Sequence, residues 1–203
     1  EVKNAREKLV EVIAEADDTL LEKYLDGQEL STQELIQGLR KGVLNKTIFP
    51  ILCGSGLKNM GVQPLLDAIV QYLPSPLDRG PTKGIHPVTK AEEIRQPEEQ
   101  GPFSAFVFKT VADPYAGKLT IFRVWSGLLQ PDSTLYNANR EVKERFGQIL
   151  QLEAKNQKPV ESVGPGDIAA VAKLRETTTW DTLCDEKKPI LYQGISLPIP
   201  PVS

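Results

Sequence analysis

Phe103-Ser-Ala-Phe-Val-Phe108 and Lys118-Leu-Thr-Ile-Phe-Arg-Val-Trp125 are the stretches that decide the fold of this chain. Both are rich in aromatic and β-branched residues, which pack well on a pleated sheet, and Gly117 and Gly127 flank the second stretch as turn residues. Further short strands are predicted at 133–137, 141–152 and 168–173. Five or more short strands separated by turns predict a closed all-β barrel, which leaves no exposed sheet edge.

Upstream of these strands the hydrophobic pattern has a helical period. Residues 7–24 carry apolar side chains at spacings of three and four, which predicts one amphipathic helix. A second helix is predicted from Ser31 to Lys41, because Ser31 and Glu34 have the spacing of a capping box. Gly42 follows as the expected left-handed stop.

A short apolar run follows these two helices. Thr47-Ile-Phe-Pro-Ile-Leu-Cys53 predicts a buried strand, and Gly61 starts a further helix. The predicted inward stripe of that helix consists of Leu65, Leu66, Ile69, Val70 and Leu73. Helices alternating with a buried strand indicate α/β layering before the all-β part.

The composition changes between Pro74 and Pro102, where six prolines and several charges predict an extended connector. The predicted organisation is therefore an α/β part at 1–76, a linker at 77–101, a β-barrel at 102–197 and the start of another connector at 198–203. At 203 residues, two domains can each bury a core.

Composition excludes several classes of protein. A net charge of −3 argues against a domain that grips nucleic acid by charge alone, and no apolar run is long enough to span a membrane. Two cysteines, Cys53 and Cys184, are expected to be reduced thiols in a cytoplasmic protein. His86 is the only histidine and is expected to be solvent-exposed in the linker, so neither a metal site nor a Ser-His-Asp triad is predicted.

The longest informative motif is Phe49-Pro-Ile-Leu-Cys-Gly-Ser-Gly-Leu-Lys-Asn-Met-Gly-Val-Gln-Pro-Leu-Leu-Asp-Ala-Ile-Val-Gln-Tyr-Leu-Pro-Ser-Pro76. It closely resembles the end of the GTP-binding domain of elongation factor G, a translational GTPase. Landmarks of the second domain of that family follow in order: Pro102-Phe-Ser-Ala-Phe-Val-Phe-Lys-Thr110, Asp113-Pro-Tyr-Ala-Gly-Lys-Leu119, Arg123-Val-Trp-Ser-Gly127, Gly164-Pro-Gly-Asp-Ile-Ala-Ala170 and Asp181-Thr-Leu-Cys184. The resemblance covers nearly the full chain.

The resemblance implies the fold class and the ligand of the first part. The expected fold is the end of a P-loop GTPase domain with a helical insertion, followed by an all-β translation-factor-type barrel. In the intact protein, which would bind GTP or GDP with magnesium, backbone amides around Ser55 and Gly56 would contact guanine, with Leu57 packing nearby. Gly56 stands where the family usually has alanine. Without the resemblance, Gly54 and Gly56 would indicate only a tight turn.

No catalytic residue is predicted in this chain. The sequence has no G-x-x-x-x-G-K-[ST] loop to cradle phosphates and no D-x-x-G motif, and Asn45-Lys46-Thr47 is followed by Ile48 where N-K-x-D requires aspartate. These parts precede this segment in the family. The chain alone is therefore expected neither to hydrolyse GTP nor to hold it tightly, as a fragment of a larger enzyme.

The second domain of the family touches small-subunit ribosomal RNA, which implies phosphate contacts by exposed cations. The candidates are Lys118, Arg123, Lys143 and Arg145, although a solvated barrel face would look the same. Aromatic residues of the strands, Phe106 and Phe108 among them, would suit either a base-stacking platform or the core, and their alternation favours the core. Trp180 stands where the family usually has glycine, and the sequence leaves its role open.

The leading hypothesis is a monomeric fragment of a ribosomal translocase that couples GTP hydrolysis to movement of tRNA and mRNA during elongation. A paralogue that acts in ribosome recycling or ribosome protection shares this domain pair. A stand-alone barrel that binds single-stranded nucleic acid is the alternative of a different class.

Overall fold

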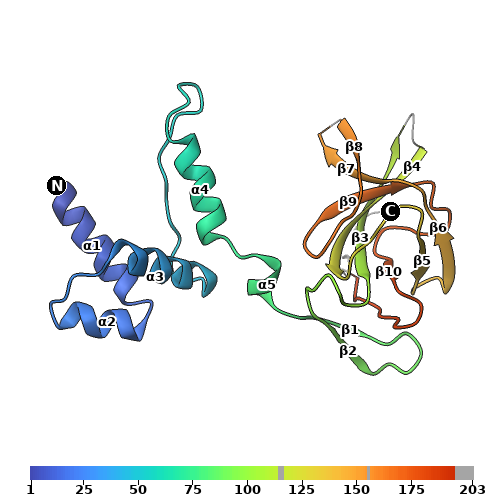
Figure 1. Cartoon of the computed structure of the whole chain (residues 1–203), viewed down its shortest axis with the longest axis horizontal. Coiled ribbons are helices and arrows are strands. Elements are labelled where there is room, and N and C mark those ends of the chain that lie inside the picture. The colour runs from blue at the N-terminus through green and yellow to red at the C-terminus, as the bar shows by residue number, and fades with distance from the viewer. Residues whose placement is uncertain (114–116, 155, 195–203) are drawn as a thin grey trace, which may run out of the picture. The chain divides into compact units, whose positions relative to one another are not determined.

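Helices make up the first part of the chain and strands the second (Figure 1). The computed structural model describes residues 1–113, 117–154 and 156–194. It contains two units, Glu1–Asp78 and Arg79–Ser203. The predicted fold class is confirmed: helices come first, and a barrel-like antiparallel sheet follows them. The predicted limits 1–76, 77–101 and 102–197 stay predictions, and the segment predicted at 198–203 lies outside the described residues.

The helices of the first part are α1 (Val2–Ala14), α2 (Asp18–Leu25), α3 (Thr32–Leu44), α4 (Val62–Tyr72) and the one-turn α5 (Pro76–Arg79). The single helix predicted over 7–24 is wrong, because the chain starts a new helix after Asp17. The Asp17 carboxylate accepts the N–H of Thr19 at 2.9 Å and that of Leu20 at 3.4 Å. This N-cap satisfies amides that would otherwise have no acceptor at the start of α2.

Helix α3 begins as predicted and ends later. Ser31 and Glu34 form both hydrogen bonds of the capping box, and the Lys23 ammonium, the Ser31 hydroxyl and the Ser31 amide hold the pKa of Glu34 at about 2. Gly42 is wrong as the left-handed stop, since it lies inside α3. A Cβ at Gly42 would stand 2.5 Å from Cδ1 of Ile48, so glycine is needed here for close packing.

The three N-terminal helices share a small core. Ile13, Ala14 and Leu20 are buried in this core. Partly buried apolar side chains from α2, from α3 and from the loop that joins these two helices surround it. Gly38 allows α3 to approach, because a Cβ there would lie 2.6 Å from Cδ1 of Leu20 and 2.8 Å from Cγ2 of Ile13. Ion pairs support this packing at the surface: Lys23 with Glu34 at 2.5 Å and Lys41 with Asp17 at 2.6 Å.

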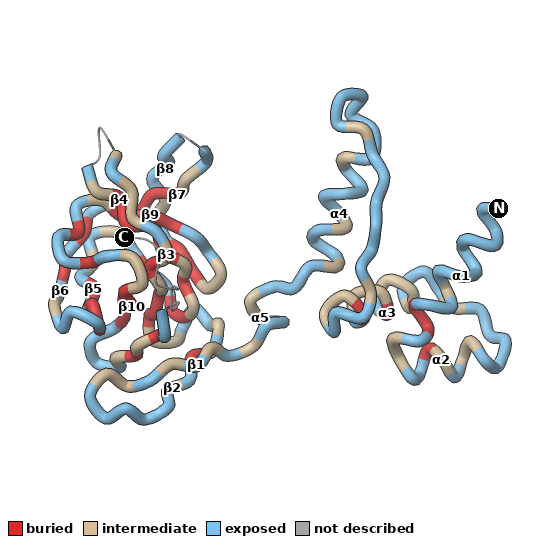
Figure 2. The backbone as a smooth tube through the Cα atoms, turned by 180° about the vertical axis from the view of Figure 1, so that it is seen from behind, coloured by how far each residue is buried: buried red, intermediate tan, exposed pale blue. Residues whose placement is uncertain are grey.

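The buried strand predicted at 47–53 is wrong. The backbone after Ile48 runs without strand pairing, and Phe49, Ile51 and Leu52 are exposed (Figure 2). A strand needs a neighbour to receive its backbone hydrogen bonds, and the described residues of this unit offer none. The stripe predicted to face inward on α4 is also exposed, for the same lack of a sheet: Leu65, Leu66, Ile69, Val70 and Leu73.

A hairpin of β1 (Thr82–Ile85) and β2 (Glu92–Arg95) occupies the segment predicted as an extended linker. Ile85 also exchanges both backbone hydrogen bonds with Leu191, at 2.9 and 2.8 Å, so the hairpin is fastened to the rest of the second unit. Prolines lie before, between and after its strands, where no ladder bond is lost.

Within the described residues, eight strands form the main antiparallel sheet, in the order β6-β5-β10-β3-β4-β9-β7-β8. Their bounds are β3 (Ser104–Asp113), β4 (Gly117–Ser126), β5 (Thr134–Asn137), β6 (Val142–Arg145), β7 (Ile149–Glu153), β8 (Asn156–Val160), β9 (Ile168–Ala172) and β10 (Thr182–Cys184). The single strand predicted at 141–152 is two strands: β6 pairs with β5, whereas β7 pairs with β8 and β9.

The sheet curls around one hydrophobic core (Figures 1 and 2). The largest fully buried apolar side chains of the strands all belong to this core: Val107, Phe122, Val124, Ile149, Val171 and Leu183. Alternation along β3 and β4 puts Phe106 and Arg123 on the opposite, outer face, where they are direct neighbours in the register. Among the described residues, none of the helices is long and apolar enough to cross a membrane.

Gly38→Ala tests the packing of α3. Although alanine favours helix formation, we expect the substitution to destabilise the helical unit by about 1–3 kcal/mol, because the added Cβ overlaps Leu20 and Ile13. Urea unfolding followed by ellipticity at the helical minimum measures this change. Gln37→Ala, on the exposed face of the same helix, is the control and should change stability by less than about 0.5 kcal/mol. Equal stability of the two variants would contradict the packing described here.

Candidate nucleic-acid interface

The four predicted RNA-contacting cations come from two strands that are not neighbours. Lys118 and Arg123 lie on β4, and Lys143 and Arg145 lie on β6, with three strands between them in the sheet order. The chain after β9 connects the two strands. Residues 173–177 run from the start of β4 to β6, and they carry two further cations, Lys173 and Arg175.

Lys118 meets this connecting segment at the start of β4. Its backbone carbonyl accepts the N–H of Lys173 at 3.0 Å, and its ammonium donates to the Arg175 carbonyl at 3.3 Å. The side chain of Lys118 is thereby directed along the segment. Lys173 is exposed and lines a groove of about 540 Å³, together with Gly147, Gln148, Leu150, Gln157, Pro159 and Ala172.

Glu144 fastens the other end of the segment to β6. The carboxylate is buried, and it accepts hydrogen bonds from the amides of Arg175, Glu176 and Thr177 and from the Thr177 hydroxyl. Burial raises the pKa of this carboxyl, but the bonds from the Thr177 hydroxyl and the three amides outweigh burial, so that the pKa is lowered overall. The charged form of Glu144 therefore positions the backbone that carries Arg175.

Arg145 and Lys143 flank Glu144 and point away from the core, since side chains alternate along a strand. Arg145 is exposed and, within the described part of the chain, has no ion-pair partner. Lys143 is paired with Glu186 at 2.7 Å, with both side chains more than half exposed. We call Lys118, Arg145, Lys173 and Arg175 the basic rim, because the connecting segment carries Lys173 and Arg175 from Lys118 on β4 to Glu144, the residue before Arg145 on β6.

Arg123 lies apart from the basic rim. Its guanidinium stacks over the Trp125 ring at 5.1 Å, and the Arg79 guanidinium lies 5.4 Å from the centre of the same ring. The Nε of Arg123 is buried and has no partner among the described residues. Arg123 is therefore held on the outer face of the sheet beside Phe106.

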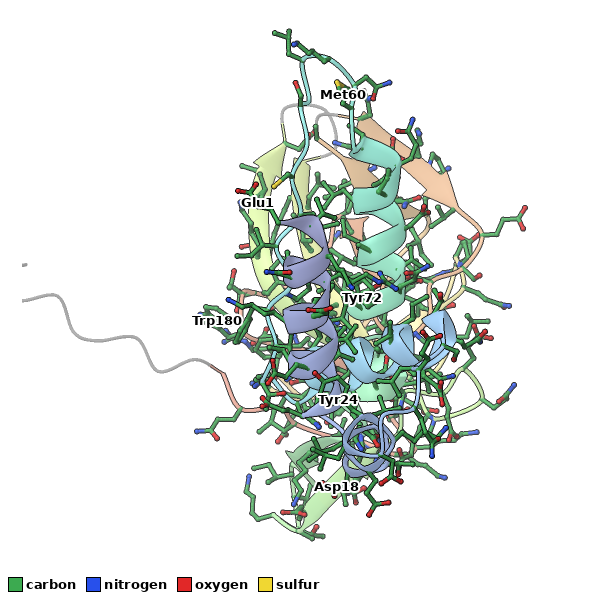
Figure 3. The ribbon with its side chains drawn as sticks, turned by 90° about the vertical axis from the view of Figure 1, so that its left-hand side faces the viewer. Glu1, Asp18, Tyr24, Met60, Tyr72 and Trp180 are labelled. Atoms are coloured by element: carbon green, nitrogen blue, oxygen red, sulfur yellow. The ribbon has the colours of Figure 1, made fainter. Side chains whose placement is uncertain are left out.

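The loop predicted to meet guanine is a six-residue turn. Ser55 and Met60, which is marked in Figure 3, exchange both backbone hydrogen bonds, at 2.9 and 3.0 Å, and close this turn. The Ser55 amide is thus engaged, whereas the amides of Gly56 and Leu57 have no acceptor among the described residues. Leu57 is 98% exposed, and a Cβ at Gly56 would meet open space. The base contact itself stays a prediction.

The remaining predicted features have structural roles. Phe103 and Phe122 are buried in the core, while Phe106, Phe108 and Trp125 are half-buried. His86 is half-buried rather than exposed, and its Nδ1 accepts the amides of Val88 and Thr89 at 3.2 Å in the turn of the β1–β2 hairpin. The described residues contain no cluster of His, Cys, Asp and Glu that could hold a metal ion.

Sequence reasoning missed Lys173, Arg175 and Glu144. Lys173 and Arg175 follow a short apolar strand, and no sequence pattern marks them as part of a site. Their position depends on where the chain crosses the barrel. Glu144 did carry a signal: an acid at the inward position of a strand, between outward-facing Lys143 and Arg145, requires buried donors.

Comparisons with known proteins identify the barrel. Residues 102–186 match the family model of elongation factor G domain 2. The structure is also similar to the crystal structure of a protein from Thermus thermophilus, with a TM-score of 0.73 and 29% sequence identity over 93% of this chain. This chain spans 26% of the length of that protein. The second unit therefore contains a domain of the translation elongation factor type.

Glu144→Gln tests the anchoring of the basic rim. We expect it to destabilise the barrel by about 2 kcal/mol near neutral pH, since an amide cannot accept all the bonds that the carboxylate accepts. Because the folded-state pKa is lowered, the advantage of Glu144 is present above its unfolded value and disappears as pH falls through the folded value. Urea unfolding by tryptophan fluorescence over a pH series measures both effects. Glu161→Gln, an exposed position, is the control, and a pH-independent difference would contradict the carboxylate's role.

Proposed function

We propose that this chain is part of a translational GTPase that acts on the ribosome, a translocase of the elongation factor G type that moves tRNA and mRNA. The observation that carries the proposal is the match of residues 102–186 to elongation factor G domain 2, in a fold shared with a much longer protein. That domain family implies interaction with the ribosome in general. The location that corresponds to this role of the intact protein is the cytoplasm.

Exposed apolar side chains in the first unit support the proposal that this unit is part of a larger GTP-binding domain. Phe49, Ile51, Leu66 and Val70 are between 57% and 91% exposed, on an unpaired segment and on a helix next to it in sequence. A sheet that paired with 48–54 would bury these side chains and would complete an α/β layer. We propose that other residues of the intact protein supply this sheet, together with the groups that bind the phosphates and magnesium of GTP.

The turn at 55–60 would then lie at the carboxyl end of a sheet strand, where α/β proteins bind nucleotides. We propose that the amides of Gly56 and Leu57 contact the guanine, because the Ser55 amide already closes the turn. Gly56 has room for a Cβ, so alanine would serve equally at this position. This chain contributes recognition of the base, and the hydrolytic step belongs to residues elsewhere in the intact protein.

The barrel would contribute contacts to small-subunit ribosomal RNA through the basic rim. Arg145 and Arg175 are exposed. The Thr177 amide donates to Glu144, which fixes the segment that carries Arg175. Cations held in this way position phosphates without reading sequence. Lys143 and Arg123 are weaker candidates than the sequence suggested, since Glu186 and Trp125 already engage them.

The first test is the size of the natural protein. An antibody against this chain should capture, from source cells, a much longer GTP-binding protein that sediments with ribosomes. Its intact mass and nucleotide content are the measurements. A natural product no longer than this chain would overturn the proposal and leave a stand-alone barrel that binds nucleic acid. Recovery on recycling or drug-protected ribosomes alone would replace the translocase with a paralogue.

A second test addresses the basic rim in that intact protein. Arg145→Ala combined with Arg175→Ala should weaken ribosome binding by about tenfold and reduce the salt dependence by about one phosphate contact per arginine. Lys83→Ala combined with Lys90→Ala removes the same charge from the exposed face of the β1–β2 hairpin and is the control. Equal effects of the two double variants would exclude the rim as a specific contact.

A further inference from the structure

Trp180 has a backbone conformation that tryptophan rarely adopts. Its φ is 77°, in the left-handed region where a Cβ crowds the backbone. It is the third residue of a turn in which the Asp181 amide donates to the Thr178 carbonyl at 3.2 Å. Glycine is the residue that such a position favours. A bulky residue kept in this conformation indicates a role for its side chain rather than for its backbone.

The surrounding structure holds the turn in place independently of the indole. The Trp180 amide donates to the Val107 carbonyl at 2.8 Å, and the hydroxyls of Thr179 and Thr110 are 3.0 Å apart. The buried Asp181 carboxylate accepts the Thr178 amide and the Asn137 side-chain amide, both at 2.9 Å. This frame offsets the strain at Trp180, so the turn does not depend on the tryptophan side chain.

The Trp180 ring is half-buried on the outer face of the sheet. It lies against Phe106, with the ring centres 5.9 Å apart and the planes tilted by 33° (Figure 3 marks Trp180). Phe106 is half-buried as well, since its neighbours Ala105 and Val107 face the core. Two rings that are packed together but still partly open to solvent form a small aromatic platform.

Cations lie on the segments next to this platform. Arg140 donates to the Thr178 hydroxyl at 2.9 Å, two residues before Trp180, and Lys109 is exposed on β3, three residues after Phe106. Arg140 is half exposed even though it also pairs with Asp181 at 3.4 Å. Trp180 also belongs to the same loop as Arg175 of the basic rim. An aromatic platform surrounded by positive charge suits an unpaired nucleotide, because the ring takes the base and the cations take the phosphates.

We propose that Trp180 stacks on an unpaired base of single-stranded RNA, with Arg140 and Lys109 beside the adjoining phosphates. This inference deepens the proposed function, since it assigns a second RNA contact to the barrel, but it stands on a different set of side chains. Stacking is tolerant of sequence, so the site selects unpaired RNA rather than a particular base.

The direct test uses Trp180 as its own probe. In the Trp125→Phe variant, Trp180 is the only tryptophan of this chain. A single-stranded oligoadenylate dodecamer should quench its fluorescence in a saturable way at low salt, whereas a double-stranded RNA of equal length should not. The absence of quenching by the single strand, at concentrations where the chain binds it in a filter assay, would overturn the stacking.

Two substitutions separate stacking from packing. Trp180→Gly should weaken dodecamer binding by about tenfold, and Trp180→Phe should keep it within about threefold, because phenylalanine retains an aromatic face. Glycine suits the left-handed backbone, so the unfolding midpoint of Trp180→Gly should stay within about 3 °C of the parent chain. A drop of more than about 10 °C would show that the indole is a structural cover, and the proposal would then fail.

The proposed function can fail separately. If Trp180→Gly binds the dodecamer like the parent chain while Arg145→Ala with Arg175→Ala still weakens ribosome binding, the stacking is wrong and the ribosomal role stands. If Trp180 binds RNA but the intact protein does not sediment with ribosomes, the ribosomal role is wrong and the stacking stands. If Trp180→Gly loses ribosome binding but the parent chain does not bind the dodecamer, Trp180 contacts a protein partner. That result would also overturn the stacking.

Discussion

Two buried carboxylates, Glu144 and Asp181, hold the loop at 173–181 across the barrel, and the candidate surface depends on them. Glu144 accepts three amides and a hydroxyl, and Asp181 accepts from Thr178, Asn137 and Arg140. Burying a charge is costly unless donors replace the lost water, and here donors converge on both groups. The loop that carries Arg175 and Trp180 is therefore a positioned surface and not a free connection.

The two units differ in how completely their own residues pair the strands and bury the apolar side chains. In the barrel, strands pair on both sides through most of the sheet, and one core fills its interior. In the first unit, α1 to α3 share a small core, whereas α4 and residues 48–54 expose apolar side chains. This contrast supports a first unit that is completed by other residues of a longer protein, and a barrel that forms its contacts by itself.

Local sequence signals predicted the elements that local physics controls. The capping box at Ser31 and Glu34, the start of α4 after Gly61, and β3 and β4 are found as expected. Errors arose where local signals compete or where a distant residue decides. Asp17 divides the predicted first helix by capping a new one, and Gly42 serves the approach of Ile48 rather than a stop. The strand predicted at 47–53 lacks a neighbour to pair with.

The sequence by itself determined that helices precede a barrel-like sheet, and it carried the resemblance that suggests a ribosomal GTPase, because hydrophobic period, turn residues and motifs are local properties. The tertiary structure alone decided which residues the segment after β9 reaches. Lys118 and Glu144 both bind the backbone of Arg175, because the chain crosses the barrel after β9 and passes between them. It also decided that Trp180 is strained beside Phe106. Both outcomes depend on hydrogen bonds and contacts between residues far apart in the chain, which no local pattern contains.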